Sequence, residues 1–331
     1  MLSRIAENLY WMGRYIERAE NTARLLNVNY LAMFEAPHAA GGQHIVTEKW
    51  THLLDIMESK EAFFKHHSYA DEDNVPYWLA LHGDNFASIR SSLYFARENA
   101  RSLRNHISTE MWEAINKSYL KLCTKIPERL GEDALYDYCV SAREASHLFF
   151  GIAHATLPHD LGWSFMRAGQ FLERADNTLR TLQANLTPKS NYTPVEAGLK
   201  VHRDMALLKS VSAYEAFRKH YHQGLSSERI YEFLLFNKSF PRSVYYSLKL
   251  LSDYLEQIYL ENPESSTKAL EKAKHLTKEI EDITQETRIT KDGNPSIPEV
   301  IRRIGAISDR LSAIYFNIYP DEIVSQEQRQ C

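Results

Sequence analysis

The chain contains the stretch GRYIERAENTARLL at residues 13–26 and a close copy, GQFLERADNTLRTL, at residues 169–182. Eight of the fourteen positions are identical at a constant offset of 156 residues, and most of the identical positions are polar or charged. Two unrelated helices would rarely share so many of these positions by chance. The pattern therefore predicts that the chain is an internal duplication.

Composition indicates a soluble globular protein. The 331 residues are 44% hydrophobic and 25% charged, which is ordinary for a chain that buries a sizeable core. Glycine (12) and proline (11) are scarce, which favours long regular elements with few turns. The formal net charge of −4 provides no basic field, so we expect no nucleic-acid partner.

The same sequence predicts a cytoplasmic location. No uncharged apolar run precedes a small-residue cleavage site near the N-terminus, so we expect no signal peptide. No stretch reaches 18 uncharged apolar residues, so we expect no membrane-spanning helix and no membrane partner. The three cysteines, Cys123, Cys139 and Cys331, lack disulfide-framework or zinc-ligand spacing, which fits a reducing compartment.

Hydrophobic spacing is helical along nearly the whole chain. In the first segment Ile5, Leu9, Met12 and Ile16 recur every three or four residues, and no alternating run predicts a strand. The predicted fold class is therefore all-α, a bundle of about ten helices. After a first helix that ends near Pro37, the expected helices cover residues 47–65, 77–105 (with a break near Gly83 left open), 109–125, 132–156, 163–185, 197–222, 227–236, 241–261, 265–288 and 297–318.

The duplication predicts two halves in one fused body. The first helical half is residues 1–156, the second is residues 157–319, and residues 320–331 form a polar tail that is expected to fray. A weaker match supports this division, because an Arg-Ser pair follows an apolar segment at Arg90 and again at Arg242. No long flexible linker separates the halves, so we expect pseudo-two-fold symmetry within one bundle.

The repeated charges allow three interpretations. They are spaced three, four and three residues apart, so they lie along one face of each helix. They could form an exposed face with weak ion pairs between neighbouring turns. They could instead form a buried polar network where the halves meet, because arginine pairs bidentately with carboxylates. The residues of this face are Arg14, Glu17, Asn21 and Arg24 in the first copy, and Gln170, Glu173, Asn177 and Arg180 in the second.

The third interpretation is a cleft that binds an anionic group such as a phosphate or carboxylate. Glu17 and Glu173 are then the catalytic candidates, since they would orient arginines or move protons. Because charge repetition is otherwise unexplained, we expect most repeat charges to be buried or to line a cleft. The ligand-binding candidates are Arg18, Asn21, Arg24, Arg97, Arg101, Arg174, Asn177 and Arg180, of which Arg97 and Arg101 come from a second charged segment that could equally be a solvated stripe.

No metal site or cofactor is expected. The chain lacks a phosphate-binding glycine loop, a dinucleotide fingerprint and a hydrolase nucleophile elbow. No set of histidine, cysteine and acidic residues has convincing ligand spacing. The nearest approach to one is Glu144, His147, His154, His159 and Asp160.

These motifs resemble the bacterial alpha-E family, an all-helical domain named for its Glu-Arg motifs. The resemblance covers the chain from Met1 to about Tyr259, and no motif follows Ser265. It is carried by residues 1–24 and by the segments Ala96–Arg101, Glu110–Glu113, Gly162–Phe165, Leu172–Thr178 and Phe240–Ser243.

The resemblance implies which proteins this chain works with and gives no established activity for the chain itself. Members of this family tend to be encoded beside, or fused to, a circularly permuted ATP-grasp protein, often with a transglutaminase-like protease. ATP-grasp enzymes form amide or peptide bonds through an acyl-phosphate. The expected role is thus a non-catalytic or accessory partner of an ATP-grasp-type ligase, with a transglutaminase-like protein as a further partner. The alternative is an enzyme that acts on a peptide-like or acyl-phosphate substrate in a Glu/Arg-lined cavity.

Overall fold

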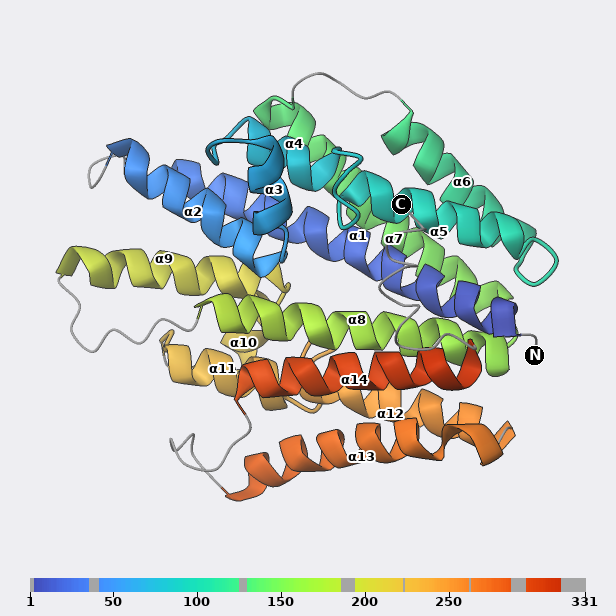
Figure 1. Cartoon of the computed structure of the whole chain (residues 1–331). Helices are drawn as coiled ribbons and strands as arrows, with labels where there is room; N and C mark the ends of the chain where they lie inside the picture. The colour runs from blue at the N-terminus through green and yellow to red at the C-terminus, as the bar shows by residue number, and fades with distance from the viewer. Residues whose placement is uncertain are drawn as a thin grey trace.

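The structure, a computed structural model, describes residues 3–35, 42–124, 130–185, 194–222, 224–261, 263–286 and 296–316. These residues form fourteen helices and no strand (Figure 1). The predicted all-α class is confirmed, whereas the expected number of about ten helices is too low. The predicted frayed tail, residues 320–331, lies outside the described residues.

The helices fall into two consecutive sets of seven within the described residues. The first set is α1 (Ser3–Glu35), α2 (Gly42–Ile56), α3 (Lys60–His66), α4 (Asn74–Ala80), α5 (Ile89–Ser102), α6 (Thr109–Cys123) and α7 (Glu132–Thr156). The second set is α8 (Leu161–Asn185), α9 (Pro194–Ser210), α10 (Tyr214–His220), α11 (Ser227–Phe236), α12 (Val244–Glu261), α13 (Pro263–Glu286) and α14 (Ile297–Tyr315).

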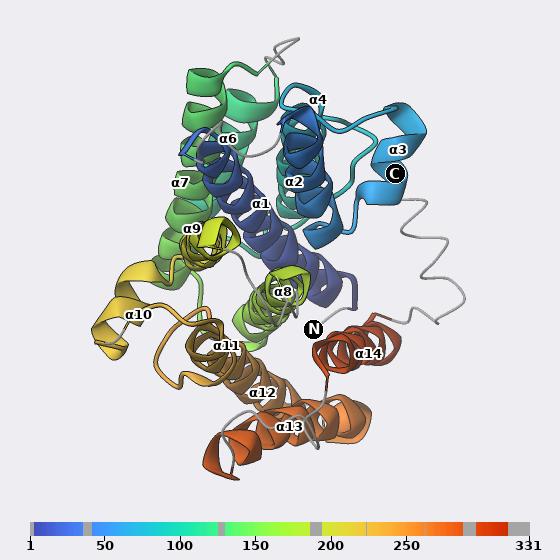
Figure 2. The same ribbon diagram turned by 90° about the vertical axis from the view of Figure 1, so that its left-hand side faces the viewer.

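The two helices that carry the repeat, α1 and α8, lie at the centre of the bundle and pack on each other (Figures 1 and 2). Helix α1 also packs on α5 and α7, and α6 bridges those two. Helix α8 packs in the same way on α12 and α14, which α13 bridges. Each central helix also reaches the other set, α1 at α9 and α8 at α2. This correspondence supports the predicted duplication, which remains our inference.

A repeat that the sequence analysis missed supports the same inference. Glu61-Ala62-Phe63 in α3 is matched 154 residues later by Glu215-Ala216-Phe217 in α10. Both phenylalanines are essentially inaccessible to solvent, so each short helix is anchored by the same core residue.

Two of the extra helices come from breaks that carry no glycine signal. The predicted helices at 47–65 and 197–222 are each interrupted, at Glu58 and at Ser212, where φ is +49° and +53°. At the first break Ser59 N–H donates to Leu54 O (3.0 Å) and Glu58 N–H to Asp55 O (3.1 Å). This is the Schellman pattern that ends helices, usually with glycine at the left-handed position. Glutamate and serine there gave the sequence analysis no stop signal.

Other element boundaries follow local chemistry. The predicted helix at 77–105 is in fact α4 and α5, and the break lies near Gly83 as considered above. Helix α5 begins where Ser88 Oγ accepts the Ser91 N–H, a standard N-cap. Helix α12 begins at Val244 and not at Pro241, because Ser243 Oγ accepts the Tyr246 N–H. None of the helices in the described ranges is long and apolar enough to cross a bilayer.

The crossing of α1 and α8 depends on two glycines. A Cβ atom added at Gly13 would overlap the carbonyl oxygen of Met166, and one added at Gly169 would overlap that of Tyr10. Met166 and Tyr10 are themselves 156 residues apart, so the two contacts are equivalent. The helix backbones can approach this closely only because both positions lack a side chain.

We predict that Gly13→Ala and Gly169→Ala each destabilise the protein strongly, because the added methyl group meets backbone that cannot rotate away. The expected loss is at the upper end of about 1–3 kcal/mol, the usual range for overpacking. Gly151→Ala in α7 is the matched control, since a Cβ there meets nothing within 4 Å. Chemical denaturation would measure all three variants. Equal midpoints for Gly13→Ala and the control would contradict the close approach.

Candidate functional site

The glutamate of each repeat copy forms an ion pair with the arginine of the other copy, where α1 crosses α8. Glu173 of α8 accepts from Arg18 Nε at 2.7 Å and from Arg14 Nε at 2.8 Å, both on α1. Glu17 of α1 accepts from Arg174 Nε at 2.8 Å and Nη2 at 2.7 Å on α8. Each glutamate therefore binds the arginine of the opposite copy. We call the residues Arg14, Glu17, Arg18, Glu20, Arg24, Gln170, Glu173, Arg174, Asp176, Arg180 and Arg242 the Glu-Arg junction.

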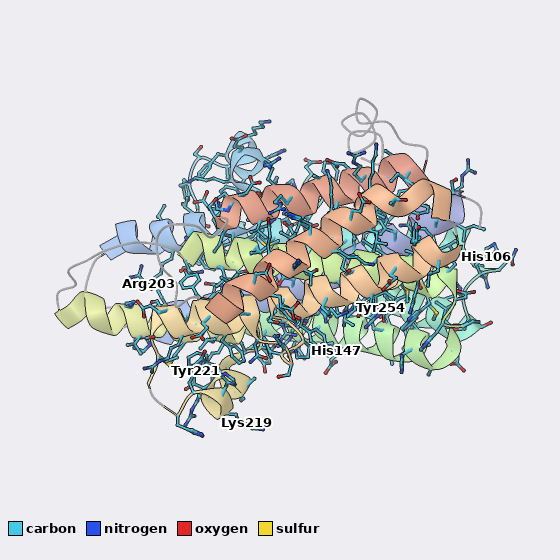
Figure 3. The ribbon with its side chains drawn as sticks, turned by 90° about the horizontal axis from the view of Figure 1, so that it is seen from below. His106, His147, Arg203, Lys219, Tyr221 and Tyr254 are labelled. Atoms are coloured by element: carbon cyan, nitrogen blue, oxygen red, sulfur yellow. The ribbon has the colours of Figure 1, made fainter. Side chains whose placement is uncertain are left out.

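Arg242 occupies one side of the junction. It lies in the loop before α12, donates to Glu17 Oε1 at 3.1 Å and to Glu20 Oε2 at 2.6 Å, and so bridges two buried carboxylates. His147 of α7, labelled in Figure 3, places its Nε2 3.6 Å from Glu20 Oε1. The sequence analysis did not select Arg242 or Glu20 as site residues. The Phe-Pro-Arg-Ser motif that contains Arg242 was the signal that could have found it.

The outer arginines of the repeat each reach the opposite half. Arg24 pairs with Glu20 on its own helix and donates to Ser212 Oγ. Arg180 pairs with Asp176, Nε to Oδ2 at 2.7 Å, and with Glu58. Ser212 and Glu58 are the two left-handed residues that end α9 and α2. The junction therefore holds both unusual helix ends in place.

Burial decides between two of the three interpretations. Glu17 is 1% exposed, Glu173 3% and Arg24 7%. Asn21 is also buried, and Arg18, Arg174, Asn177 and Arg180 are partly buried. The exposed-face interpretation is therefore wrong, and the charges form the buried network predicted for the meeting of the halves.

The paired carboxylates are held in their charged form. Burial alone would raise the pKa of Glu173, but Arg18 and Arg14 outweigh it and lower that pKa to about 2. Burial likewise opposes ionisation of Glu17, yet Arg174 and Arg242 keep its pKa below the ordinary value. Such carboxylates are poor proton acceptors at neutral pH. The catalytic role predicted for Glu17 and Glu173 stays a prediction, and this geometry disfavours it.

Asp176 differs from its counterpart Glu20. Burial raises the pKa of Asp176 to about 7, and neighbouring Glu173 adds to the rise, whereas the positive charges of Arg14 and Arg18 oppose it. For Glu20, Arg242 and hydrogen bonds outweigh burial and hold the pKa well below its ordinary value. Asp176 is thus the carboxyl of the junction that is most easily protonated.

The two sides of the junction differ because only one of the two corresponding arginines, Arg242 and not Arg90, reaches the junction carboxylates. Arg242 fills the Glu20 side, but Arg90, its sequence counterpart, instead has Nη1 3.4 Å from the carbonyl oxygen of Leu81. On the Asp176 side a cavity of about 460 Å³ opens between the halves. Its polar lining is Glu7, Arg14, Arg18, Glu58, Glu173, Asp176, Asn177, Arg180 and Ser312, and its aromatic lining is Trp11, Tyr15, Phe86 and Phe95.

Three of the eight predicted ligand residues line this cavity, namely Arg18, Asn177 and Arg180. Asn21, Arg24 and Arg174 lie on the same two central helices but do not line it, and two more lie on another helix. Arg97 of α5 donates from Nε to Asn116 Oδ1 of α6 at 2.8 Å and lies 4.9 Å from the centroid of the Tyr119 ring. Arg101 is 64% exposed and pairs with Glu98. Neither lines the cavity. Their role in ligand binding stays a prediction, but the charged face of α5 packs toward α6 and solvent and so lies apart from this cavity.

The histidines and acids considered for metal binding have other contacts. Asp160 Oδ1 accepts the Gly162 N–H at 2.8 Å, at the start of α8. The His159 ring stacks on Trp163, with centroids 4.2 Å apart, and His147 contacts Glu20. Among the described residues, Glu144, His147, His154, His159 and Asp160 form no group of converging ligand atoms.

Comparison with known families decides which family this is. A family model described as "a predicted alpha-helical domain with a conserved ER motif" matches residues 1–316. The chain belongs to the Alpha-E family. The reciprocal pairs Glu17–Arg174 and Glu173–Arg18 place both Glu-Arg motifs of this Alpha-E chain at one junction.

Curated relatives of this Alpha-E chain are longer. It is similar to uncharacterized proteins of Mycobacterium bovis and Mycobacterium tuberculosis, with 26% identity over 271 residues in each. The match covers 77% of this chain but 30% of each relative, so the chain spans about a third of their length. No solved structure matches the chain significantly.

We predict that acid unfolds this protein partly through Glu173. Its folded pKa is depressed from 4.5 to about 2, so its contribution is present above pH 4.5 and is lost as pH falls toward 2. That shift corresponds to about 3 kcal/mol. Glu173→Gln should be less stable at pH 7, because it leaves Arg14 and Arg18 without their carboxylate, and should lose less stability between pH 4.5 and 2.

Urea midpoints across that pH range measure this effect. Glu299→Gln, which removes an exposed carboxylate paired with Arg302, is the control and should behave like the wild type at pH 7. An acid profile for Glu173→Gln that is as steep as that of the wild type would refute the assignment.

Proposed function

We propose that the chain is a non-catalytic helical partner of an ATP-grasp-type amide or peptide ligase. The cavity at the Glu-Arg junction would hold the anionic group of a ligand or of a docking segment. The observation that supports ligand binding is the cavity itself, which is lined by Arg14, Arg18 and Arg180 together with aromatic side chains. Apolar walls are typical of ligand sites, and the large share of charged groups in this lining favours a charged ligand.

The charges of the lining favour a peptide-like ligand. Three arginines are accompanied by four acidic residues, Glu7, Glu58, Glu173 and Asp176. A polyphosphate would meet repulsion from these carboxylates, which are close to the arginines that would attract it. A molecule with a carboxylate and an amino group can satisfy both charge types, and its side chains can contact Trp11 or Phe95.

Asn177 supports a polar ligand in the same place. Its Nδ2 atom is buried and has no hydrogen-bond partner, although the residue lines the cavity. Buried donors in native structures usually have partners, so an unpaired one needs an explanation. A carboxylate or amide oxygen of a ligand would provide that acceptor.

The longer relatives support a partnership. In the mycobacterial proteins the matching region is about a third of the polypeptide, so this helical region is joined there to other sequence in one chain. Family resemblance supplies the ATP-grasp assignment, with a transglutaminase-like protein as a further partner. We place the chain in the cytoplasm, where ATP is available to such a ligase and where the buried free thiols of Cys123 and Cys139 would stay reduced.

One observation favours the alternative, an enzyme acting on a peptide-like or acyl-phosphate substrate. Asp176 lines the cavity, and burial raises its pKa to about 7. A carboxyl group near that value can both accept and donate a proton at neutral pH. In this alternative Asp176, and not Glu17 or Glu173, carries the proton transfer.

We predict that Arg180→Lys weakens ligand binding without unfolding the chain. Lysine keeps the charge but loses the planar fork that pairs with a carboxylate. The loss of a charge-assisted hydrogen bond of about 1.5–3 kcal/mol corresponds to roughly 10- to 100-fold in affinity. Titration calorimetry with a panel of dipeptides would measure it. Arg24→Lys is the matched control, because Arg24 occupies the equivalent repeat position but lies outside the cavity.

An assay of the ligase tests the partnership separately. We expect amide-product formation by an ATP-grasp ligase from the same organism to fall when this chain is omitted, and to fall in part with Arg180→Lys. Full product formation without the chain would refute the partnership. Product formation by the chain alone, lost in Asp176→Asn, would establish the enzyme alternative. Melting curves for each variant separate these results from unfolding.

A further inference from the structure

Two histidines and an aspartate converge on the surface beside the cavity wall. His66 is the last residue of α3, and His82 and Asp84 lie in the loop between α4 and α5. One potential ligand atom from each residue lies within 4.8 Å of those of the other two. His66 Nε2 is 3.9 Å from Asp84 Oδ2, and the two imidazole rings are 5.2 Å apart at their centroids.

The surroundings hold these groups in place. The His82 ring packs on buried Trp78, with centroids 4.7 Å apart, and the His66 ring lies 5.3 Å from the same tryptophan. The backbone N–H of Asp84 donates to His82 Nδ1 at 3.3 Å, which keeps the backbone of this loop against the imidazole ring.

The fold itself does not require this cluster. In the second half His220 ends α10 as His66 ends α3, and its ring lies 5.7 Å from Phe233, the counterpart of Trp78. Among the described residues no group of three potential ligands forms around it, and Asn237 forms the following turn by accepting the N–H groups of Ser239 and Phe240. The packing histidine is thus common to both halves, whereas the two further ligand groups occur only in the first half.

We propose that His66, His82 and Asp84 bind a divalent transition-metal ion, with zinc as the best match, and so fasten the α4–α5 loop to α3. Two imidazoles and a carboxylate are zinc ligands, and water would complete a tetrahedral set. Ligand atoms around tetrahedral zinc are about 3.4 Å apart. Side-chain movements of about 1 Å would bring the three ligand atoms to that separation. The nitrogen donors disfavour calcium and magnesium, which prefer oxygen.

The position of this site gives it a role at the cavity. Phe86 and Ala87, which follow Asp84 in the same loop, line the cavity, and so do Met57 and Glu58, just before α3. A metal ion between His66 and Asp84 would join the two segments that form this wall. The sequence analysis expected no metal, because the ligands come from elements that are adjacent only in space.

Titration calorimetry on the full chain, prepared without a histidine tag and stripped with a chelator, tests the site. We expect one zinc ion per chain and a change in intrinsic tryptophan fluorescence, to which Trp78 beside the site contributes, at the same stoichiometry. With cobalt, visible absorption of a tetrahedral ion should appear. His82→Ala and Asp84→Asn should each weaken zinc binding by at least about tenfold, the lower bound for loss of even an outer-shell partner.

His220→Ala is the matched control, since it removes the equivalent packing histidine without its companions. It should leave zinc affinity unchanged. The proposal is overturned if no saturable binding is found, if both His82→Ala and Asp84→Asn bind zinc like the wild type, or if His220→Ala weakens binding equally. Circular dichroism of each variant establishes that it is folded before titration.

Discussion

The structure depends on two reciprocal ion pairs, Glu17–Arg174 and Glu173–Arg18. They lie where α1 and α8 touch through glycine. Gly13 and Gly169 bring the backbones together, and that closeness puts the two glutamates where water cannot solvate them. Each buried carboxylate must then have its arginines, since removing one partner of a buried pair costs about 3–5 kcal/mol. The charges therefore specify how the two central helices are aligned.

The same requirement explains why the helices around the crossing are placed as they are. Arg24 and Arg180 extend from the central helices to Ser212 and Glu58, which hold left-handed conformations that non-glycine residues adopt only at a cost of about 1–2 kcal/mol. Strain of this kind persists where surrounding contacts over-determine it. A charged junction at the centre thus fixes the ends of α2 and α9, and through Glu58 it shapes one wall of the cavity.

The features that suggest a function are those in which the two halves differ. Arg242 neutralises Glu20 on one side, but Arg90 turns to a carbonyl group and leaves Asp176 beside open space. A second histidine and an aspartate converge with His66, whereas the described residues form no such group at His220. A structural network needs the pairs that the halves share. The unshared features, a cavity with a weakly held carboxyl and a cluster of metal-ligand groups, are not needed for that network.

The sequence by itself determined the helical class, the family and the importance of the Glu-Arg repeat, because period, motif and offset are local properties of the chain. It did not determine the breaks at Glu58 and Ser212, where hydrogen bonds and distant arginines hold a conformation that neither residue favours. Nor could it exclude Arg97 from the site or bring His66 to Asp84. Those outcomes depend on which faces of separate helices meet, and only the packing of α1 on α8 and of α5 on α6 decides that.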